Sequence, residues 1–154
     1  MKRLSLLFAL ATSMAALPSV SAQRTLSTLV DRNRVLLIFT PTALDGRYGR
    51  QLDAFNHHEA ELQSRDLVLI PLVQQPGPAN ISPVLRNMRP PIVQADEQIT
   101  FRKRFHIGPA DFVVILLGKD GTEKLRSSAP ISLMRLNRTI DAMPGRQQEM
   151  RNPR

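Results

Sequence analysis

The chain has 154 residues, of which 21 are Lys or Arg, 13 are Asp or Glu and none is Cys. A globular chain of this length forms one domain with a sizeable core. Because it has no thiol, it cannot perform disulfide exchange or cysteine peroxidase chemistry. It also cannot hold an iron–sulfur cluster, a cysteine-ligated zinc ion or a lipid-modified N-terminal cysteine.

The first 22 residues have the three-part pattern of an export signal. Lys2 and Arg3 form a cationic start, residues 4–17 are mostly apolar, and Val20-Ser21-Ala22 presents the small residues that a signal peptidase reads. We expect cleavage after Ala22. The apolar stretch is shorter than the ~20 residues that a membrane span needs. The sequence therefore predicts an exported protein, periplasmic or extracellular, with residues 23–154 as the mature chain and no transmembrane segment in it.

Two apolar runs separated by a helical pattern follow. Residues 35–39 and 67–70 are short and continuously apolar, which is typical of strands buried on both faces, and Pro71 is expected to interrupt or end the second. Between them, residues 45–64 are predicted to form one amphipathic helix. Its apolar face consists of Tyr48, Leu52, Phe55 and Leu62. A strand, a helix and a strand predict a parallel pair with a right-handed crossover.

Residues 74–94 are proline-rich, which indicates an irregular excursion with one turn of helix near residues 84–87. A short helix is predicted over residues 96–105, with acidic residues at its start and basic ones at its end, as the helix dipole favours. Phe101 and Phe105 would face the core, and Gly108 is a plausible C-terminal stop.

The last third of the chain predicts a hairpin and a helix. Residues 112–117 and 122–126 read as antiparallel strands joined by a Gly-Lys-Asp-Gly turn. Pro130 opens a final helix whose apolar face consists of Leu133, Leu136, Ile140 and Met143. Residues 144–154 are predicted to be a flexible basic tail. The resulting order is β-α-β-(loop)-α-β-β-α.

This α/β order is that of thioredoxin-like folds, in which helices flank a central mixed sheet. Residues 105–121 resemble the C-terminal half of thioredoxins and peroxiredoxins. More specifically, Arg34–Pro41, Arg65–Leu69 and Gly118–Arg126 resemble a thioredoxin/peroxiredoxin-like domain-of-unknown-function family. That family includes small exported bacterial proteins and domains of sushi-repeat and coiled-coil matrix proteins. The resemblance implies a thioredoxin-like domain over residues 23–143 and brings no established catalytic residues.

In thioredoxins and peroxiredoxins the reactive cysteine follows the first strand, at the start of the first helix. Here residues 40–48 occupy that stretch, so cysteine-dependent redox activity is excluded. The same helix start could bind an anion through its free N–H groups, with Thr42, Asp45, Arg47, Tyr48 and Arg50 as candidate binding residues. The alternative is structural: Thr42-x-x-Asp45 fits a capping box, and Tyr48 begins the core-facing stripe.

Histidines and a basic cluster are also candidates for metal ligands or for a nucleic-acid site. His57 and Glu61 share a helix face and could supply two metal ligands, but nothing nearby supplies a third, so neither a metal nor a cofactor is predicted. His106 is expected to cap a helix or lie on the surface. The basic cluster at residues 102–104 lacks free aromatic partners, so nucleic acid is not an expected partner.

Two functional hypotheses remain. The first is an exported, non-redox binding or interaction module whose partner is an envelope or extracellular protein or an anionic ligand. The second is a thiol-independent enzyme with an anion-binding site at residues 42–48.

Overall fold

The computed structural model describes residues 22–77 and 82–152. The predicted export signal, residues 1–22, lies outside the described residues except for Ala22, which begins the first helix. Cleavage after Ala22 stays a prediction. Within the described ranges, no helix has the length and the apolar character needed to cross a membrane.

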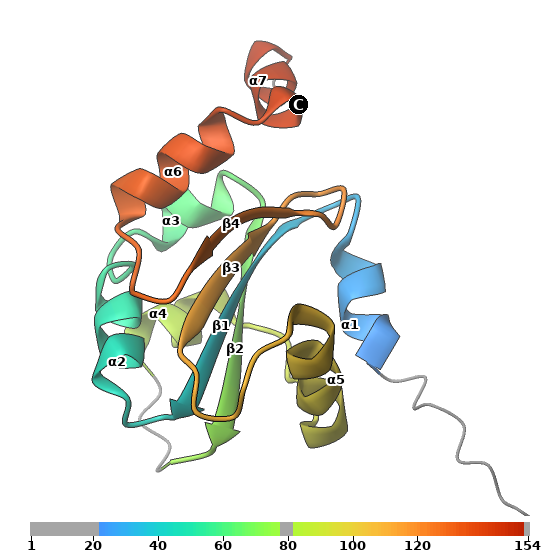
Figure 1. Ribbon diagram of the computed structural model, residues 1–154. Helices are drawn as coiled ribbons and strands as arrows, with labels where there is room; N and C mark the ends of the chain where they lie inside the picture. The colour runs from blue at the N-terminus through green and yellow to red at the C-terminus, as the bar shows by residue number, and fades with distance from the viewer. Residues whose placement is uncertain (1–21, 78–81, 153–154) are drawn as a thin grey trace, which may run out of the picture.

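Four strands form one mixed sheet in the order β2-β1-β3-β4 (Figure 1). They are β1 (Arg34–Thr42), β2 (Leu67–Gln75), β3 (Val113–Leu117) and β4 (Glu123–Ser127). β1 pairs with β2 in parallel, whereas β3 runs antiparallel to both β1 and β4. The parallel pair and the hairpin predicted from the sequence are both confirmed. In the hairpin turn, Gly121 has a φ of +71°, a conformation that glycine adopts without strain.

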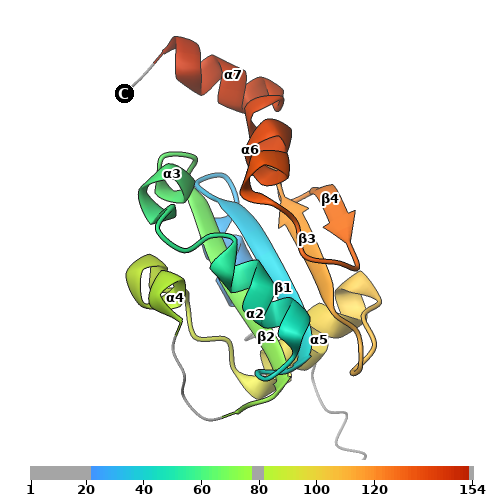
Figure 2. The ribbon, with the colours of Figure 1, turned by 90° about the vertical axis from the view of Figure 1, so that its left-hand side faces the viewer.

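Helices cover both faces of this sheet (Figure 1, Figure 2). One face carries α2 (Gly46–Asp53), α3 (Glu59–Gln63), α4 (Pro83–Met88) and α6 (Leu133–Asp141), and the other carries α1 (Ala22–Leu29) and α5 (Ala95–Phe105). The side chains of β1 divide between the two layers: Leu36 and Ile38 pack on the first face, and Leu37 and Phe39 on the second. Because both faces are covered, residues 35–39 of β1 are all apolar rather than alternating.

The helix predicted over residues 45–64 is two helices, so that prediction is wrong in its continuity. The chain leaves helical geometry between α2 and α3, where His57 has a φ of +67°. The bend keeps both Phe55 and Leu62 fully buried against the sheet. The predicted apolar stripe of Tyr48, Leu52, Phe55 and Leu62 is therefore confirmed, although no single helix carries it.

Pro71 was expected to interrupt or end the second strand, and it does not end it. β2 continues to Gln75, and Pro71 lies opposite Ile38 of β1. β2 is an edge strand with β1 as its one neighbour, and edge strands are where proline is tolerated in a sheet.

The structure adds a helix at each end of the domain. Residues 22–29 form α1, and Leu26 packs in the layer shared with α5. At the other end, Pro144–Arg151 form α7, a helix that was not predicted within the flexible basic tail expected at residues 144–154. α7 has no buried residue, so its position depends on polar contacts. The proposed domain limits of 23 and 143 stay a prediction.

Candidate functional site

The junction between β1 and α2 is the region where the sequence predicts a binding site. Asp45 is the N-cap residue of α2, and its Oδ1 accepts a hydrogen bond of 2.8 Å from the backbone N–H of Arg47. Thr42 instead accepts a hydrogen bond of 2.9 Å from the N–H of Leu44 through its hydroxyl oxygen. The capping expected here is present, but Asp45 rather than Thr42 caps the helix.

The side chain of Arg47 also binds Asp45 at this junction. Its Nε and a terminal guanidinium nitrogen donate to the two carboxylate oxygens of Asp45 at 3.0 and 2.6 Å. The guanidinium also lies over the ring of Phe112, 5.3 Å from its centroid. The side-chain hydrogen bond from Arg47 lowers the pKa of Asp45, against the opposing effect of burial. The Asp45 carboxylate thus occupies the place that an external anion would take at this helix start.

The structure places the five candidate residues in three different environments. Thr42, Asp45 and Arg47 lie together in the turn. Tyr48 turns into the core, where burial raises its pKa to about 12 and keeps the phenol neutral at ordinary pH. Arg50 is exposed on α2. The anion site predicted at residues 42–48 stays a prediction. In the structure, the backbone N–H and the guanidinium of Arg47 both bind Asp45.

The two adjacent histidines do not form a metal centre. His58, not His57, approaches Glu61, with 3.4 Å between Nδ1 and Oε2, because the chain bends between α2 and α3. Among residues 22–77 and 82–152, no three His, Asp or Glu side chains come together as a metal site would need. His106 caps α5 in a left-handed conformation with a φ of +56°, a position for which Gly108 had been expected.

Arg102 is one of the buried polar residues that were not predicted from the sequence. It belongs to the basic cluster at residues 102–104, yet it is only 6% exposed. Its guanidinium donates to the carbonyl oxygens of Thr40 and Leu72 at 2.9 and 3.1 Å, and to that of Gly108 at 2.7 Å. It therefore ties the ends of β1 and β2 to the loop before β3. Helical spacing was the available signal, because Arg102 lies next to Phe101 and three residues before Phe105 on the buried side of α5.

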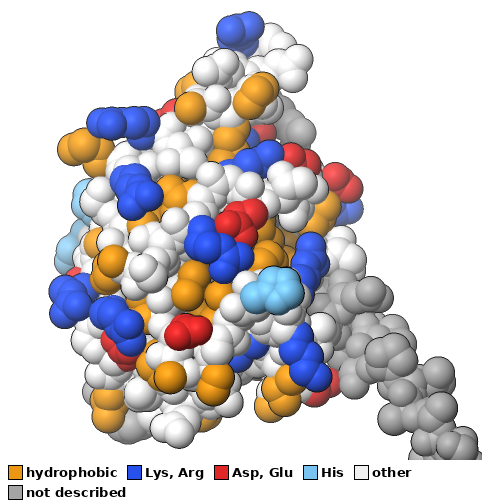
Figure 3. Space-filling view, in the orientation of Figure 1, with side chains coloured by type: hydrophobic (Ala, Val, Ile, Leu, Met, Phe, Trp, Pro, Cys, Tyr) orange, Lys and Arg blue, Asp and Glu red, His pale blue; other side chains and the backbone are white. Residues whose placement is uncertain are grey.

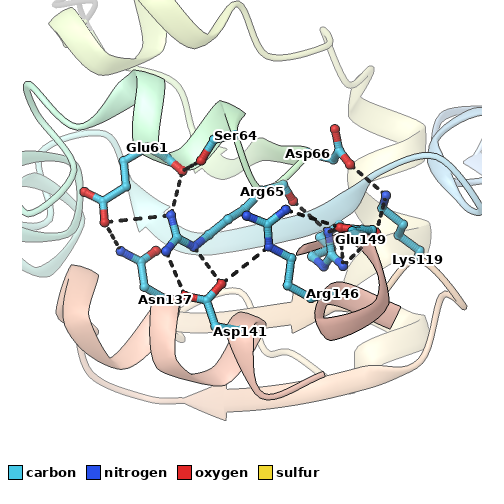
Figure 4. Close-up of polar contacts among 10 residues, drawn as sticks. Glu61, Ser64, Arg65, Asp66, Lys119, Asn137, Asp141, Arg146 and Glu149 are labelled. Carbon is cyan, nitrogen blue, oxygen red and sulfur yellow. Dashed lines mark hydrogen bonds and ion pairs between the residues drawn. The ribbon is translucent and has the colours of Figure 1, made fainter. Parts of the chain in front are cut away.

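A second polar cluster lies at the opposite end of β1, where α7 meets the domain (Figure 4). Arg65, which follows α3, binds Asp141 at the end of α6 with 2.8 Å between Nη2 and Oδ2. Asp141 also contacts Arg146 of α7, and Lys119 after β3 reaches Glu149 at 2.8 Å. These ion pairs join three helices to the sheet end and offer no unpaired nucleophile or base, so we assign them a structural role.

The sheet order, the helices on both faces and the β1–α2 junction together define a thioredoxin-like domain. Within that class, a family model described as "Domain of unknown function (DUF4174)" matches residues 25–149, and the chain belongs to this family. Both the fold class and the family resemblance predicted from the sequence are confirmed.

Similar proteins agree with this assignment. The rat protein "Sushi repeat-containing protein SRPX" is 28% identical over 142 residues, which cover 90% of this chain but only 30% of that relative. The solved structure of StoA from Bacillus subtilis has a TM-score of 0.51 at 17% identity, over 70% of this chain and 82% of StoA. Reduced 2-Cys peroxiredoxin from Plasmodium vivax has a TM-score of 0.56 at 13% identity, over 79% and 83% of the two chains. At these identities, the structural likeness shows the fold alone.

Proposed function

We propose that this domain is an exported, thiol-independent binding module that holds a protein partner at the loop after β1. The observation that carries the proposal is the closed Asp45–Arg47 turn at the start of α2. Thioredoxins and peroxiredoxins present their reactive thiol at this place, whereas this chain presents a capped helix and has no cysteine. Binding therefore fits the arrangement better than turnover.

The surface of the same loop supports a protein partner. Leu44, directly before the cap, is 75% exposed, and Arg50 is exposed one turn along α2. Arginine is among the residues that contribute most to binding energy at protein interfaces, and an exposed apolar side chain gains stability when a partner removes it from water. Capping by Asp45 holds the loop in one conformation, which lowers the entropy cost of binding.

The test is capture of a partner from an envelope extract by the purified chain beginning at Gln23. We expect a reproducible partner that is retained after the thiols of the extract are alkylated, because no mixed disulfide can form with this chain. Leu44→Ser with Arg50→Gln should reduce its recovery at least about tenfold, which corresponds to about 1.4 kcal/mol.

A matched control lies on another helix. Met134 of α6 is 70% exposed and Arg138 is exposed beside it, so Met134→Ser with Arg138→Gln removes the same kinds of groups elsewhere. This variant should capture as much partner as the parent chain. Equal recovery with the Leu44/Arg50 variant, or no partner at any ionic strength, would contradict the proposal.

A further inference from the structure

An open cavity of about 550 Å³ lies between the last turns of α5 and the end of β2. Its lining includes Gln74, Ile99, Arg102, Lys103, His106 and Pro109. In Figure 3, basic and hydrophobic side chains lie side by side over the α5 region, in the lower right of the molecule. The cavity is on the α5 face of the sheet and does not include the loop after β1. An inference about it is therefore independent of the proposed partner site.

The side chains that line this cavity include two cations, Arg102 and Lys103, and no carboxylate. Arg102 is more than nine-tenths buried, and its hydrogen-bond partners are the three backbone carbonyls described above. Its Nε is buried and makes no hydrogen bond within the described part of the chain. Among the same residues, no carboxylate lies within ion-pair distance of Arg102. Carbonyl dipoles solvate a guanidinium but do not neutralise it, so a buried cation of this kind favours an anion nearby.

The surrounding groups add charge and an apolar wall. Lys103 is exposed on the cavity side of α5 and makes no ion pair among the described residues. Asp111 acts on Arg102 through its charge but lies beyond ion-pair distance, and its Oδ2 accepts a hydrogen bond of 2.8 Å from the N–H of Gly108. Ile99, which is 52% exposed, and Pro109 supply apolar surface next to these cations.

We propose that this cavity binds a small organic anion, a carboxylate joined to an apolar body. The carboxylate lies near Lys103 and the buried Arg102, and the apolar body lies against Ile99. The volume is within the range that small-molecule sites have, and binding needs both halves of the ligand because the charge alone would stay in water.

Three probes distinguish binding of the carboxylate from binding of the apolar body. Hexanoate has both a carboxylate and an alkyl chain, acetate has the carboxylate without the long chain, and 1-hexanol has the chain without the charge. We expect hexanoate to bind the purified chain at one saturable site by calorimetry, with backbone amide shifts at residues 99–109. Acetate and 1-hexanol should each bind at least about tenfold more weakly. Raising the salt from about 50 to about 500 mM should weaken hexanoate binding, because the shorter Debye length screens the cations.

Two variants decide where the probe binds. Lys103→Gln with His106→Asn should weaken hexanoate at least about tenfold, and asparagine tolerates the left-handed backbone at residue 106. Arg104→Gln removes one positive charge from the same helix, but Arg104 lies over the Phe105 ring and is not among the residues that line the cavity. This variant should bind hexanoate with the affinity of the parent chain.

The proposal is overturned if hexanoate does not bind, if 1-hexanol binds equally well, or if the Lys103/His106 variant keeps the parent affinity. Each of these outcomes leaves the capture experiment at Leu44 and Arg50 unaffected, so the two proposals fail separately.

Discussion

Arg34, at the start of β1, holds Glu149 of α7 through three hydrogen bonds of 3.1 to 3.3 Å, although 115 residues separate them in the chain. The arginine is only 2% exposed, and it also donates to the carbonyl oxygen of Arg65 at 2.9 Å. Lys119 adds a further contact to Glu149 at 2.8 Å. Together with the Arg146–Asp141 pair, this carboxylate holds a helix that buries none of its own residues.

The first prediction concerns acid stability. Burial is the largest single influence on Glu149 and opposes ionisation, but hydrogen bonds and charges from Lys119 and Arg34 outweigh it and lower its pKa from 4.5 to about 2. Because the folded pKa is below the unfolded one, the stabilisation is present above pH 4.5 and is lost as the pH falls from 4.5 toward 2. Glu149→Gln should cost about 1–2 kcal/mol at pH 7 and have almost no effect near pH 2.

Thermal midpoints measured across this pH range check the prediction. Glu123→Gln is the control, since Glu123 pairs with Arg126 at the surface of β4 and its loss should matter less. Parallel pH curves for the parent chain and Glu149→Gln would show that the ion pair does not stabilise the fold.

The second prediction concerns the cap of α2. Asp45→Ala removes the acceptor for the N–H of Arg47 and should lower the free energy of unfolding by about 1 kcal/mol, as loss of an N-cap does. Asp45→Asn keeps an acceptor and should cost less. Urea unfolding measures both, with Thr42→Val as the control because Thr42 does not cap the helix. A larger loss for Thr42→Val than for Asp45→Ala would reassign the cap.

The third prediction concerns Gln51, a fully buried polar side chain on α2. Its amide donates to the carbonyl oxygen of Ile131 at 3.1 Å and accepts from the N–H of Ile131 at 2.8 Å. Gln51→Leu leaves both backbone groups unsatisfied and should cost about 2–3 kcal/mol in urea unfolding. Gln63→Leu, at an exposed position of α3, should stay within about 0.5 kcal/mol of the parent chain. Similar losses for the two variants would mean that the Ile131 contacts carry little stability.

The fourth prediction concerns Arg102. A lysine at this position has one ammonium group and cannot reach the carbonyls of Thr40, Leu72 and Gly108 together. Arg102→Lys should therefore lower the unfolding free energy by about 2–4 kcal/mol, whereas Arg104→Lys on the same helix should be nearly neutral. Hydrogen exchange at the ends of β1 and β2 should rise only in the first variant. Unchanged exchange there would contradict the bridging role.

Local patterns in the sequence predict the elements that form the core, because those elements are buried on both faces or along one stripe. The apolar run of β1 and the stripe from Tyr48 to Leu62 are examples. The break between α2 and α3 could not be predicted, since no glycine or proline stands between residues 53 and 59 and His57 adopts a positive φ instead.

Polar positions were harder to predict than apolar ones. Thr42 and Asp45 both have an oxygen suited to capping, and only the backbone geometry selects Asp45. α7 has no apolar periodicity, and its docking depends on Arg34, which is distant in the chain. Ion pairs between distant residues leave no local pattern in a sequence.

We infer that the carboxylate of Asp45 closes the start of α2 and that no external anion binds there. A titration of the nitrogen-15-labelled chain with inorganic phosphate tests it through the amide signals of Gly46, Arg47 and Tyr48. We predict no saturable shift of these signals in the parent chain. A saturable shift at these amides that is lost in an Arg47→Ala, Arg50→Ala variant would contradict the claim and would favour the anion-binding enzyme hypothesis.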